Sequence, residues 1–318
     1  MVAPLTRVSA PSRLHMGLID LAHATPRTYG GFGLMIDHPG VIVTGRPAKV
    51  TTLSGDLSLP ERDVLTRIVE TLCSAHALPG CDIEIVAQPR AHAGLGRGTA
   101  LRLAALACVA AGSEIAIDSD EIRRLSERGG TSGVGVSGFF AGGLIVDAGH
   151  RGRRAFAPSA DVHPTSTPPV ISRIELDPRW FVTLALPTTK GKSGVGESDF
   201  FQRSTPVPAS DVLSQLALLY HGILPALVER DLVAAGTHYA QFSRLGFKSL
   251  EIAASPASLS AIELLSTIAP FVGMSSVGPC VFAISEESIL RRATSRLPCN
   301  YTVIETRANN VGHVICDA

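Results

Sequence analysis

The chain has 318 residues, of which 45% are hydrophobic. This length exceeds that of a typical single domain and predicts one or two lobes around a substantial apolar core. Lys and Arg together number 28, as do Asp and Glu. The balance removes the electrostatic reason to expect nucleic acid or a membrane surface as a partner. An anionic ligand would therefore have to be held by a local site.

Cysteine usage and the apolar stretches indicate the compartment. The six cysteines are widely scattered, with no C-x-x-C pair and no Cys/His cluster at zinc spacing, as is typical of buried thiols in a reducing cytoplasm. The N-terminal residues lack the apolar segment of a secretion signal. The longest apolar stretch, 103–117, is interrupted by Gly112, Ser113 and Glu114 and falls short of a membrane span. We expect a soluble, cytoplasmic protein.

Residue periodicity in the first half alternates between strand and helix. The patterns predict, in chain order, a strand at 41–53, a helix at 61–76, a strand at 82–87, a glycine-rich turn at 92–98, a helix ending at Gly112, a helix at 118–128 and a buried strand at 142–147. The first half is therefore expected to mix α and β elements.

The second half begins after a segment rich in Pro, Ser and Arg, residues 151–169, whose lack of periodicity is typical of a crossing between lobes. We place the two lobes at 1–165 and 166–318. The later patterns predict a strand at 181–186, a Gly/Lys/Ser loop at 188–196, helices at 211–229 and 258–268, and strands at 281–284 and 301–305. Alternation without regular βαβ spacing favours two α+β lobes over a doubly wound sheet.

A glycine-rich turn directly precedes the helical run of the first half. Gly94, Gly96 and Gly98 alternate with Leu95 and Arg97, and Thr99 follows. Glycine lets the backbone approach a ligand closely, and the N–H groups of a helix's first turn attract anions. Arg97 would add a planar donor to diphosphate, and Thr99 a hydroxyl for phosphate or magnesium. The alternative is a plain turn, because the pattern is neither a Walker loop nor a full G-x-G-x-x-G.

Two further turns combine glycine with hydroxyl groups. Residues 128–136 begin with Arg128 and contain Gly130, Thr131 and Ser132, and residues 273–281 contain Ser275 and Ser276. The first could be a second anion-binding nest or only a turn between helices.

Charged residues near the N-terminus and near residue 197 are further candidates. Arg13, His15 and Asp20 are interleaved with apolar residues. Strand alternation would set Arg13 and His15 on one face, where a cation and an imidazole meet one ligand, although an edge strand with solvated polar residues has the same pattern. Glu197 and Asp199 would bind a metal or transfer protons, or simply form a solvated loop end.

Seven segments, in order along nearly the whole chain, resemble the β-ribofuranosylaminobenzene 5′-phosphate synthase family, a branch of the GHMP kinase superfamily. They are residues 12–20, 29–33, 92–99, 128–136, 142–150, 168–173 and 273–279. The resemblance implies a two-lobed α+β GHMP-kinase-like fold whose N-terminal half is like ribosomal protein S5, and a homodimer. Lobe 1–165 would then carry the phosphate loop.

The resemblance also implies an activity. A ribosyl group passes from phosphoribosyl diphosphate to a ring carbon of an aromatic or heteroaromatic carboxylate, and CO₂ and diphosphate are released. Mg²⁺ would neutralise the leaving diphosphate. The candidate site then has catalytic Arg13, His15 and Asp20, metal ligands Thr99 and Glu197, and substrate-binding Gly94, Leu95, Gly96, Arg97, Gly98, Thr99, Arg128, Gly130, Thr131, Ser132, Ser275 and Ser276.

Four departures from the family's usual residues leave the acceptor open. Arg97 stands in place of serine, Ala100 of glutamine, Tyr29 of aspartate and Val277 of tryptophan. The acceptor is then either para-aminobenzoate or a nitrogen heterocycle such as a pyrazole carboxylate, as in C-nucleoside antibiotic pathways. The alternatives are an ATP-dependent kinase of the same superfamily, which would be expected to have serines at positions 97 and 98, and a non-catalytic phosphosugar-binding protein.

Overall fold

The structure is a computed structural model of the chain and describes residues 5–113, 115–159, 161, 162, 164, 166–188 and 195–317. Most of the loop predicted at 188–196, and three residues of the crossing predicted at 151–169, lie outside the described residues. The described chain forms two mostly antiparallel sheets with helices packed on them. The α+β fold class predicted from the sequence is confirmed.

The strands belong to a larger and a smaller sheet. The larger sheet has the order β12 (Val314–Asp317), β1 (Thr6–Asp20), β2 (Arg27–Pro47), β4 (Cys81–Ala87) and β3 (Thr52–Ser54), with β5 (Leu144–Asp147) and β6 (His150–Arg151) paired to β2 and β7 (Val170–Ile174) paired to β5. The smaller sheet has the order β11 (Tyr301–Thr306), β8 (Phe181–Pro187), β10 (Val281–Ser285) and β9 (Phe271–Met274).

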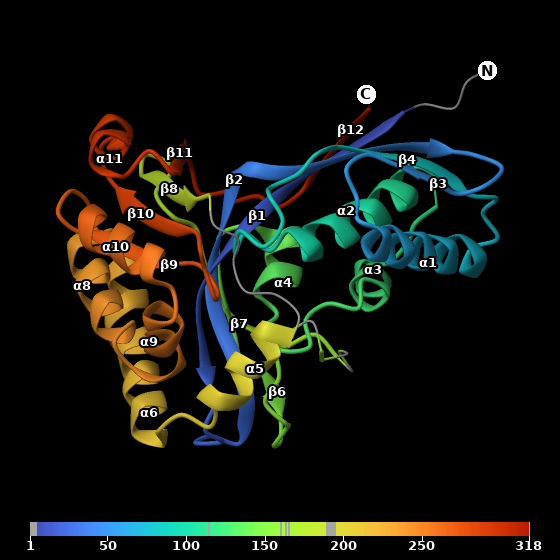
Figure 1. Cartoon of the computed structure of the whole chain (residues 1–318). Helices are drawn as coiled ribbons and strands as arrows, with labels where there is room; N and C mark the ends of the chain where they lie inside the picture. The colour runs from blue at the N-terminus through green and yellow to red at the C-terminus, as the bar shows by residue number, and fades with distance from the viewer. Residues whose placement is uncertain are drawn as a thin grey trace.

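The helices divide between the two halves of the chain. They are α1 (Leu59–Ala75), α2 (Arg97–Gly112), α3 (Ser119–Leu125), α4 (Val134–Ala141), α5 (Val195–Ser204), α6 (Ala209–Leu218), the π-helix η1 (Leu219–Ile223), α7 (Leu224–Val228), α8 (Leu232–Phe242), α9 (Gly246–Ala253), α10 (Pro256–Leu265) and α11 (Leu290–Arg296). Figure 1 shows β1 and β2 running through the middle of the molecule, with α1 to α4 on one side and α6, α8, α9 and α10 on the other.

β1 changes from half-covered to fully buried along its length. Burial alternates at its start, where Val8 and Ala10 are buried and Arg7 and Ser9 are not. From Leu14 onward every residue of the strand is buried. β1 contacts α2 and α4 of the first half and α6 and α9 of the second, so both of its faces are covered there.

Two main apolar cores lie against the larger sheet. One joins Val8 and Val41 to Leu72 of α1 and Leu106 of α2. The other joins β1 and β2 to α6, η1, α8 and β8, so it is shared by both halves of the chain. The two lobes are therefore packed through a common core.

The lobe boundary placed at residue 165 does not coincide with the boundary between the sheets. β7 pairs with β5, aligning Arg173 with Ile145, and β12 pairs with β1, aligning Ile315 with Val8. The second half therefore adds two strands to the larger sheet. Both strands are short and largely exposed, so they lack the alternating burial by which a strand is recognised from its sequence.

Several helices are absent from the sequence prediction: α4, α5, α8, α9 and α11. α4 continues from the turn predicted at 128–136, and its Gly135 and Gly138 weaken the helical signal. α9 begins at Gly246 and buries Lys248, a residue type expected at the surface. Glycines and charged residues at these helical positions interrupt the apolar spacing from which a helix is predicted.

Residues Ala209–Val228, formed by α6, η1 and α7, make up the one helix among the described residues that is long and apolar enough to cross a membrane. Its Val212, Leu219 and Ile223 are buried in the core shared by the two halves. A core helix of a soluble protein has the same length and composition, so this helix is weak evidence for a membrane span.

Phe32 is expected to be a main contributor to stability, because it joins β2 to α8. Its ring is fully buried, with centroids 6.1 Å from Tyr239 and 5.2 Å from Phe242. Phe32→Ala should lower the free energy of unfolding by ~3–5 kcal/mol through the cavity it leaves. Val233→Ala, at a 66% exposed position of the same helix, is the control and should change it by less than ~0.5 kcal/mol. Equal losses in chemical denaturation would contradict this assignment.

Candidate active site

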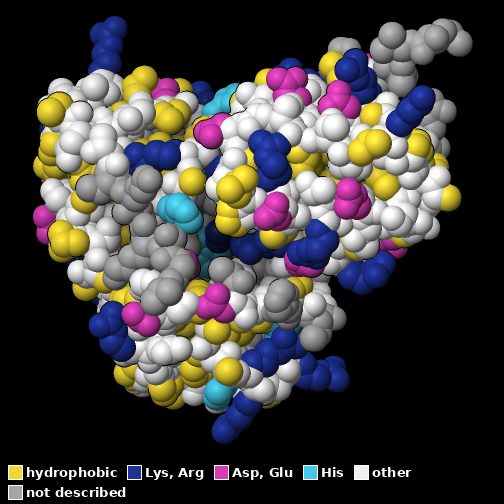
Figure 2. Space-filling model, turned by 45° about the vertical axis from the view of Figure 1, so that its right-hand side comes forward, with side chains coloured by type: hydrophobic (Ala, Val, Ile, Leu, Met, Phe, Trp, Pro, Cys, Tyr) yellow, Lys and Arg dark blue, Asp and Glu magenta, His cyan; other side chains and the backbone are white. Residues whose placement is uncertain are grey.

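A cavity of about 160 Å³ is lined by residues from both halves of the chain. Figure 2 shows one face of the molecule with a hollow near its middle, where Lys, Arg and His side chains gather. The residues that line the cavity are Arg13, His15, Leu18, Thr99, Arg128, Gly129, Thr131, Ser132, Gly135, Val136, Ser159, Glu197, Phe201, Glu251, Ser276 and Val277.

β1 carries Arg13 and His15 into this cavity, as their alternate spacing predicted. The Arg13 backbone N–H donates to the Leu95 carbonyl at 3.0 Å. The His15 backbone N–H donates to Ser275 Oγ at 2.9 Å, and the His15 carbonyl accepts from the Ser276 N–H at 2.8 Å. β1 is thereby tied to the glycine turn and to the turn after β9.

The glycine turn makes room for its neighbours. Gly96 precedes α2 in the left-handed conformation, with φ of 70°, and a Cβ added to it would lie 3.0 Å from Arg13 Nε. A Cβ on Gly94 would lie 2.7 Å from the Ser275 carbonyl oxygen. Ser275 Oγ donates to the Gly94 carbonyl at 2.6 Å. Glycine at both positions therefore allows Arg13 and the turn after β9 to pack against this loop.

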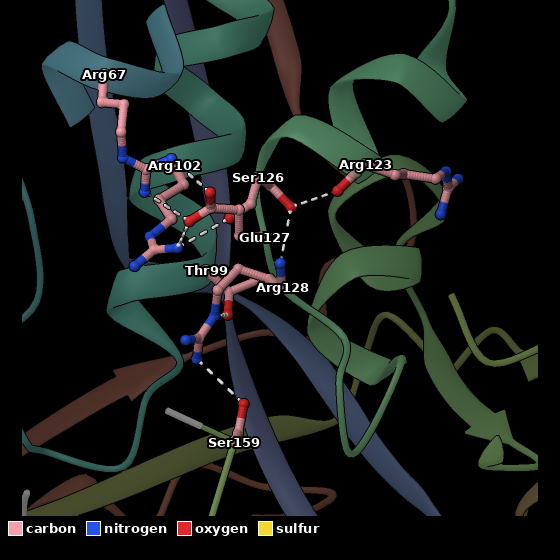
Figure 3. A network of polar contacts seen from close by, with 8 residues as sticks. All are labelled: Arg67, Thr99, Arg102, Arg123, Ser126, Glu127, Arg128 and Ser159. Atoms are coloured by element: carbon pink, nitrogen blue, oxygen red, sulfur yellow. Dashed lines mark hydrogen bonds and ion pairs between the residues drawn. The ribbon is translucent and has the colours of Figure 1, made fainter. Parts of the chain in front are cut away.

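Arg128 reaches the cavity from the segment that follows α3. Its Nε donates to Thr99 Oγ1 at 3.0 Å, and its Nη2 donates to Ser159 Oγ at 3.3 Å (Figure 3). Thr99 lies in the first turn of α2. Three segments far apart in the sequence thus place one guanidinium and two hydroxyls side by side.

A second layer of polar contacts fixes the backbone before Arg128. Glu127 accepts from Arg67 Nη2 at 2.8 Å and from Arg102 Nη1 at 3.4 Å (Figure 3). Arg102 Nη1 also donates to the Ser126 carbonyl at 3.1 Å. Helices α1 and α2 therefore both anchor this segment.

Asp147 holds the turn that contains Ser132. Its Oδ2 accepts from Ser132 Oγ at 2.8 Å and from the Gly133 N–H at 2.9 Å, and burial raises the pKa of its carboxyl to about 6. A Cβ on Gly31 would lie 3.0 Å from both Ser132 Oγ and His15 Nε2. The missing side chain of Gly31 therefore lets Ser132 and the His15 ring approach each other.

Two carboxylates, the half-buried Glu197 of α5 and the buried Glu251 of α9, complete the lining. Burial raises the pKa of both carboxyls. Glu251 Oε2 forms an ion pair with Lys248 Nζ at 2.6 Å. Lys248 Nζ also donates to the carbonyls of Met274 and Ser276, each at 3.2 Å.

The guanidinium groups keep their charge in this environment. Burial lowers the pKa of Arg13 to about 10, with Arg128 as the second cause, and burial likewise lowers the pKa of Arg128 to about 10. Burial, followed by the charges of Arg13 and Lys248, lowers the pKa of His15 well below its usual value, so its imidazole is neutral at neutral pH. Within the described parts of the chain, the Arg13 guanidinium has no hydrogen-bond or ion-pair partner.

The cavity brings together part of the predicted site: Arg13, His15, Thr99, Arg128, Thr131, Ser132, Glu197 and Ser276. It is not lined by Asp20, Gly94, Leu95, Gly96, Arg97, Gly98, Gly130 or Ser275. The glycine turn and Ser275 position Arg13 and His15 from behind, and a Cβ on Gly130 would lie 2.2 Å from the Val162 carbonyl oxygen.

Arg97 and Asp20 have structural partners in place of the expected ligand. Arg97 forms an ion pair with Glu61, and its Nε donates to Gln88 Oε1 at 2.8 Å. The Asp20 carboxylate accepts backbone N–H groups after β1, among them that of Thr25 at 2.8 Å. Both side chains are used by local structure, which the sequence pattern did not indicate.

Other lining residues were missed from the sequence. Glu251 and Lys248 lie in α9, which was not predicted, although their spacing of three residues is that of a helical ion pair. Ser159 lies in the segment without periodicity, where nothing indicated a site. Asp147, which positions Ser132, was included only within the expected buried strand.

Among the described residues no group of three or more His, Cys, Asp or Glu side chains could hold a metal ion. Thr99 and Glu197, the predicted metal ligands, both line the cavity. In phosphate sites Mg²⁺ commonly takes one or two protein ligands and completes its shell with phosphate oxygens and water. These two oxygen donors therefore fit Mg²⁺ only in company with a phosphorylated ligand.

The fold defines the class of protein. Homoserine kinase from Cytophaga hutchinsonii superposes with a TM-score of 0.70 at 15% identity, covering 98% of each chain. A mevalonate kinase superposes with a TM-score of 0.65 at 12% identity, covering 96% of this chain and 99% of the other. The chain has the GHMP kinase fold, and at such identities the likeness concerns the fold alone.

The family follows from closer relatives. No protein-family model matches the chain. The β-ribofuranosylphenol 5′-phosphate synthase of Archaeoglobus fulgidus is 34% identical over 316 residues, covering 97% of this chain and 98% of the relative. That of Methanocaldococcus jannaschii is 30% identical over 329 residues, covering 97% and 99%. The chain belongs to the β-ribofuranosylphenol 5′-phosphate synthase family, which confirms the resemblance inferred from its motifs and makes it an enzyme.

Gly96 and Gly98 form a matched pair for testing the glycine turn. Gly96→Ala should lower the free energy of unfolding by ~1–3 kcal/mol, because alanine is strained at positive φ, and should weaken the binding of a carboxylate anion such as benzoate by displacing Arg13. A Cβ on Gly98 meets nothing within 4 Å, so Gly98→Ala should stabilise α2 by up to ~1 kcal/mol. Denaturation and calorimetric titration measure both effects. Equal behaviour of the two variants would remove the special role of Gly96.

Proposed function

We propose that the enzyme is a decarboxylating C-ribosyltransferase. It transfers the 5-phosphoribosyl group of phosphoribosyl diphosphate to a ring carbon of an aromatic or heteroaromatic carboxylate, releasing CO₂ and diphosphate. The family supports this reaction, since the names of the relatives describe a ribofuranosyl group on a phenol, with a 5′-phosphate.

The observation that carries the proposal is the charge of the cavity. The Arg13 guanidinium has no partner among the described residues, and Arg128 donates only to hydroxyls there. Placing such cations away from water costs free energy unless a ligand supplies the opposite charge. A donor with three phosphate groups and an acceptor carboxylate supply that charge.

Each residue of the cavity has a role in one stage of the proposed reaction. Departure of diphosphate leaves positive charge at the anomeric carbon, and Arg128 with the Thr99 hydroxyl stabilises the leaving group. The ring carbon that bears the carboxylate attacks, and loss of CO₂ restores aromaticity. Arg13 holds this carboxylate until it leaves, with the neutral His15 ring beside it. Mg²⁺, held by Glu197 and the donor's phosphates, would supply further charge neutralisation.

The acceptor proposed first is a hydroxybenzoate. Decarboxylating ribosylation of 4-hydroxybenzoate gives a ribosylphenol, the group in the relatives' names. Its hydroxyl, para to the attacking carbon, donates electrons to that carbon. 4-Aminobenzoate and a pyrazole carboxylate are the alternative acceptors.

A homodimer and a cytoplasmic location stay predictions.

A product assay tests the reaction. Purified enzyme with phosphoribosyl diphosphate, Mg²⁺ and carboxyl-labelled 4-hydroxybenzoate should release CO₂ and diphosphate in equal amounts and form a C-riboside 5′-phosphate, identified by mass. Chelation should abolish turnover, because the departing diphosphate is then less neutralised. ADP formation from ATP and a small alcohol, without CO₂ release, would instead indicate a kinase. Donor binding with no turnover of any of the three acceptors would indicate a binding protein.

The two arginines should separate acceptor from donor effects. Arg13→Ala should lower kcat/KM for the acceptor by ~10- to 100-fold, the usual loss of a charge-assisted contact, and should affect donor affinity little. Arg128→Ala should weaken donor binding by a similar factor. Steady-state kinetics with calorimetry of donor binding distinguishes the two. If Arg13→Ala impairs donor binding and spares acceptor kinetics, Arg13 belongs to the phosphate pocket.

A further inference from the structure

The cavity has two walls of different chemistry. The wall from the first half of the chain carries Arg128 and the Thr99 hydroxyl. The wall from the second half carries the apolar side chains of Phe201 and Val277 together with the carboxylates of Glu197 and Glu251. Phosphate groups bind cations and hydroxyls, whereas an aromatic ring packs on apolar side chains. The donor therefore fits the first wall and the acceptor ring fits the second.

Helix α9 and its neighbours build the second wall as one unit. The Phe201 ring lies 4.7 Å from the Phe247 ring of α9, measured between centroids. The next residue of α9, Lys248, donates to the Ser276 carbonyl, and Val277 follows Ser276 in the chain. The apolar part of the wall and the carboxylate on α9 are thus held in one arrangement.

The Glu251 carboxylate is a buried hydrogen-bond acceptor on this wall of the cavity. Its side chain is 4% exposed and that of Lys248 is not exposed at all, and the two form an ion pair at 2.6 Å. Lys248 Nζ also donates to two backbone carbonyls, those of Met274 and Ser276. An ionised carboxylate has about four acceptor positions, and Glu251 Oε2 accepts no hydrogen bond from the described residues. In its ionised form, paired with Lys248, Glu251 can therefore accept a hydrogen bond from a ligand in the cavity.

We propose that Glu251 binds the ring hydroxyl of the acceptor and removes its proton as the new carbon–carbon bond forms. This inference rests on the proposed function. It restricts the acceptor to aromatic carboxylates that carry a hydrogen-bond donor opposite the carboxylate.

The proposed step balances as follows. The proton of the ring hydroxyl moves to the Glu251 carboxylate, and the oxygen's electron pair moves through the ring to the carbon that bears the carboxylate. That carbon bonds to the anomeric carbon, and diphosphate leaves with the electron pair of its C–O bond. The bond to CO₂ then breaks and returns its electron pair to the ring as a phenolate. The phenolate recovers the proton from Glu251.

Other titratable groups of the cavity are less suited to this role. A Cβ added to Gly31 would lie 3.0 Å from both His15 Nε2 and Ser132 Oγ. The imidazole therefore lies beside Ser132, in the wall from the first half. Glu197, on the same helix as Phe201, is the residue proposed to hold Mg²⁺ with the donor's phosphates. Glu251 is therefore the carboxylate of this wall that is left for the acceptor's hydroxyl.

Glu251→Gln is the first test, with Glu263→Gln on the exposed side of α10 as the matched control. Removal of a general base should lower kcat with 4-hydroxybenzoate by at least ~100-fold. The affinity for phosphoribosyl diphosphate, measured by calorimetry, should stay within about threefold, because the donor lies on the other wall. The control should match the unmodified enzyme in both measurements.

An acceptor that is already ionised provides the sharper test. In 3,5-difluoro-4-hydroxybenzoate the fluorines make the hydroxyl more acidic, so much less proton removal is required. The ratio of kcat between the unmodified enzyme and Glu251→Gln should therefore fall at least about tenfold relative to 4-hydroxybenzoate. An equal ratio with both acceptors would mean that Glu251 only maintains the structure, and would overturn the proposal.

A double variant removes the concern that Glu251→Gln leaves a buried ammonium unpaired, which is strongly destabilising. Lys248→Met combined with Glu251→Gln should recover thermal stability but keep the low rate with 4-hydroxybenzoate. Recovery of the full rate would overturn the proposal. If the unmodified enzyme releases no CO₂ from any acceptor, the proposed function itself fails and this inference falls with it.

Discussion

Arg13 and Arg128 place two positive charges in one partly buried cavity, and the rest of the site depends on how the fold tolerates them. Arg128 lowers the pKa of Arg13, yet both stay charged at neutral pH. No carboxylate forms an ion pair with either among the described residues. Holding unpaired cations there costs folding free energy, which must be offset by packing elsewhere. An anionic ligand relieves this cost, so the same feature that burdens the fold favours binding.

The packing that offsets this cost is concentrated on β1. Its backbone bonds to the glycine turn through Leu95 and to the turn after β9 through Ser275, and helices from both halves cover its two faces. Arg13 therefore has little freedom to withdraw from the cavity. Arg128 is held in the same way, because Glu127 joins its backbone to α1 and α2. The scaffold fixes both charges before any ligand arrives, which is the arrangement that electrostatic catalysis requires.

Sequence patterns predicted the parts of this site that depend on local geometry. The period of two in a strand brought Arg13 and His15 together, and the position of Thr99 at the start of a helix followed from the glycines before it. Such patterns could not predict contacts between residues that are distant in the sequence. The glycine turn predicted Arg97 as a phosphate ligand, and its ion pair with Glu61 could not be inferred from that pattern. Glu251 was missed because α9 carries buried charged residues that conceal its helical period.

The fold of this chain fixes the position of the cationic wall but does not determine the chemistry that takes place there. In this chain the cations and hydroxyls come from β1, the start of α2 and the segments around Arg128 and Ser159, whereas the opposite wall comes from α5, α9 and the turn at Ser276. A phosphorylated donor can be held by the first wall whatever group is transferred. The nature of the acceptor then depends on the second wall, where a hydroxyl-binding carboxylate lies among apolar side chains. The residues of this second wall, and not the fold, therefore determine which acceptor the cavity can take.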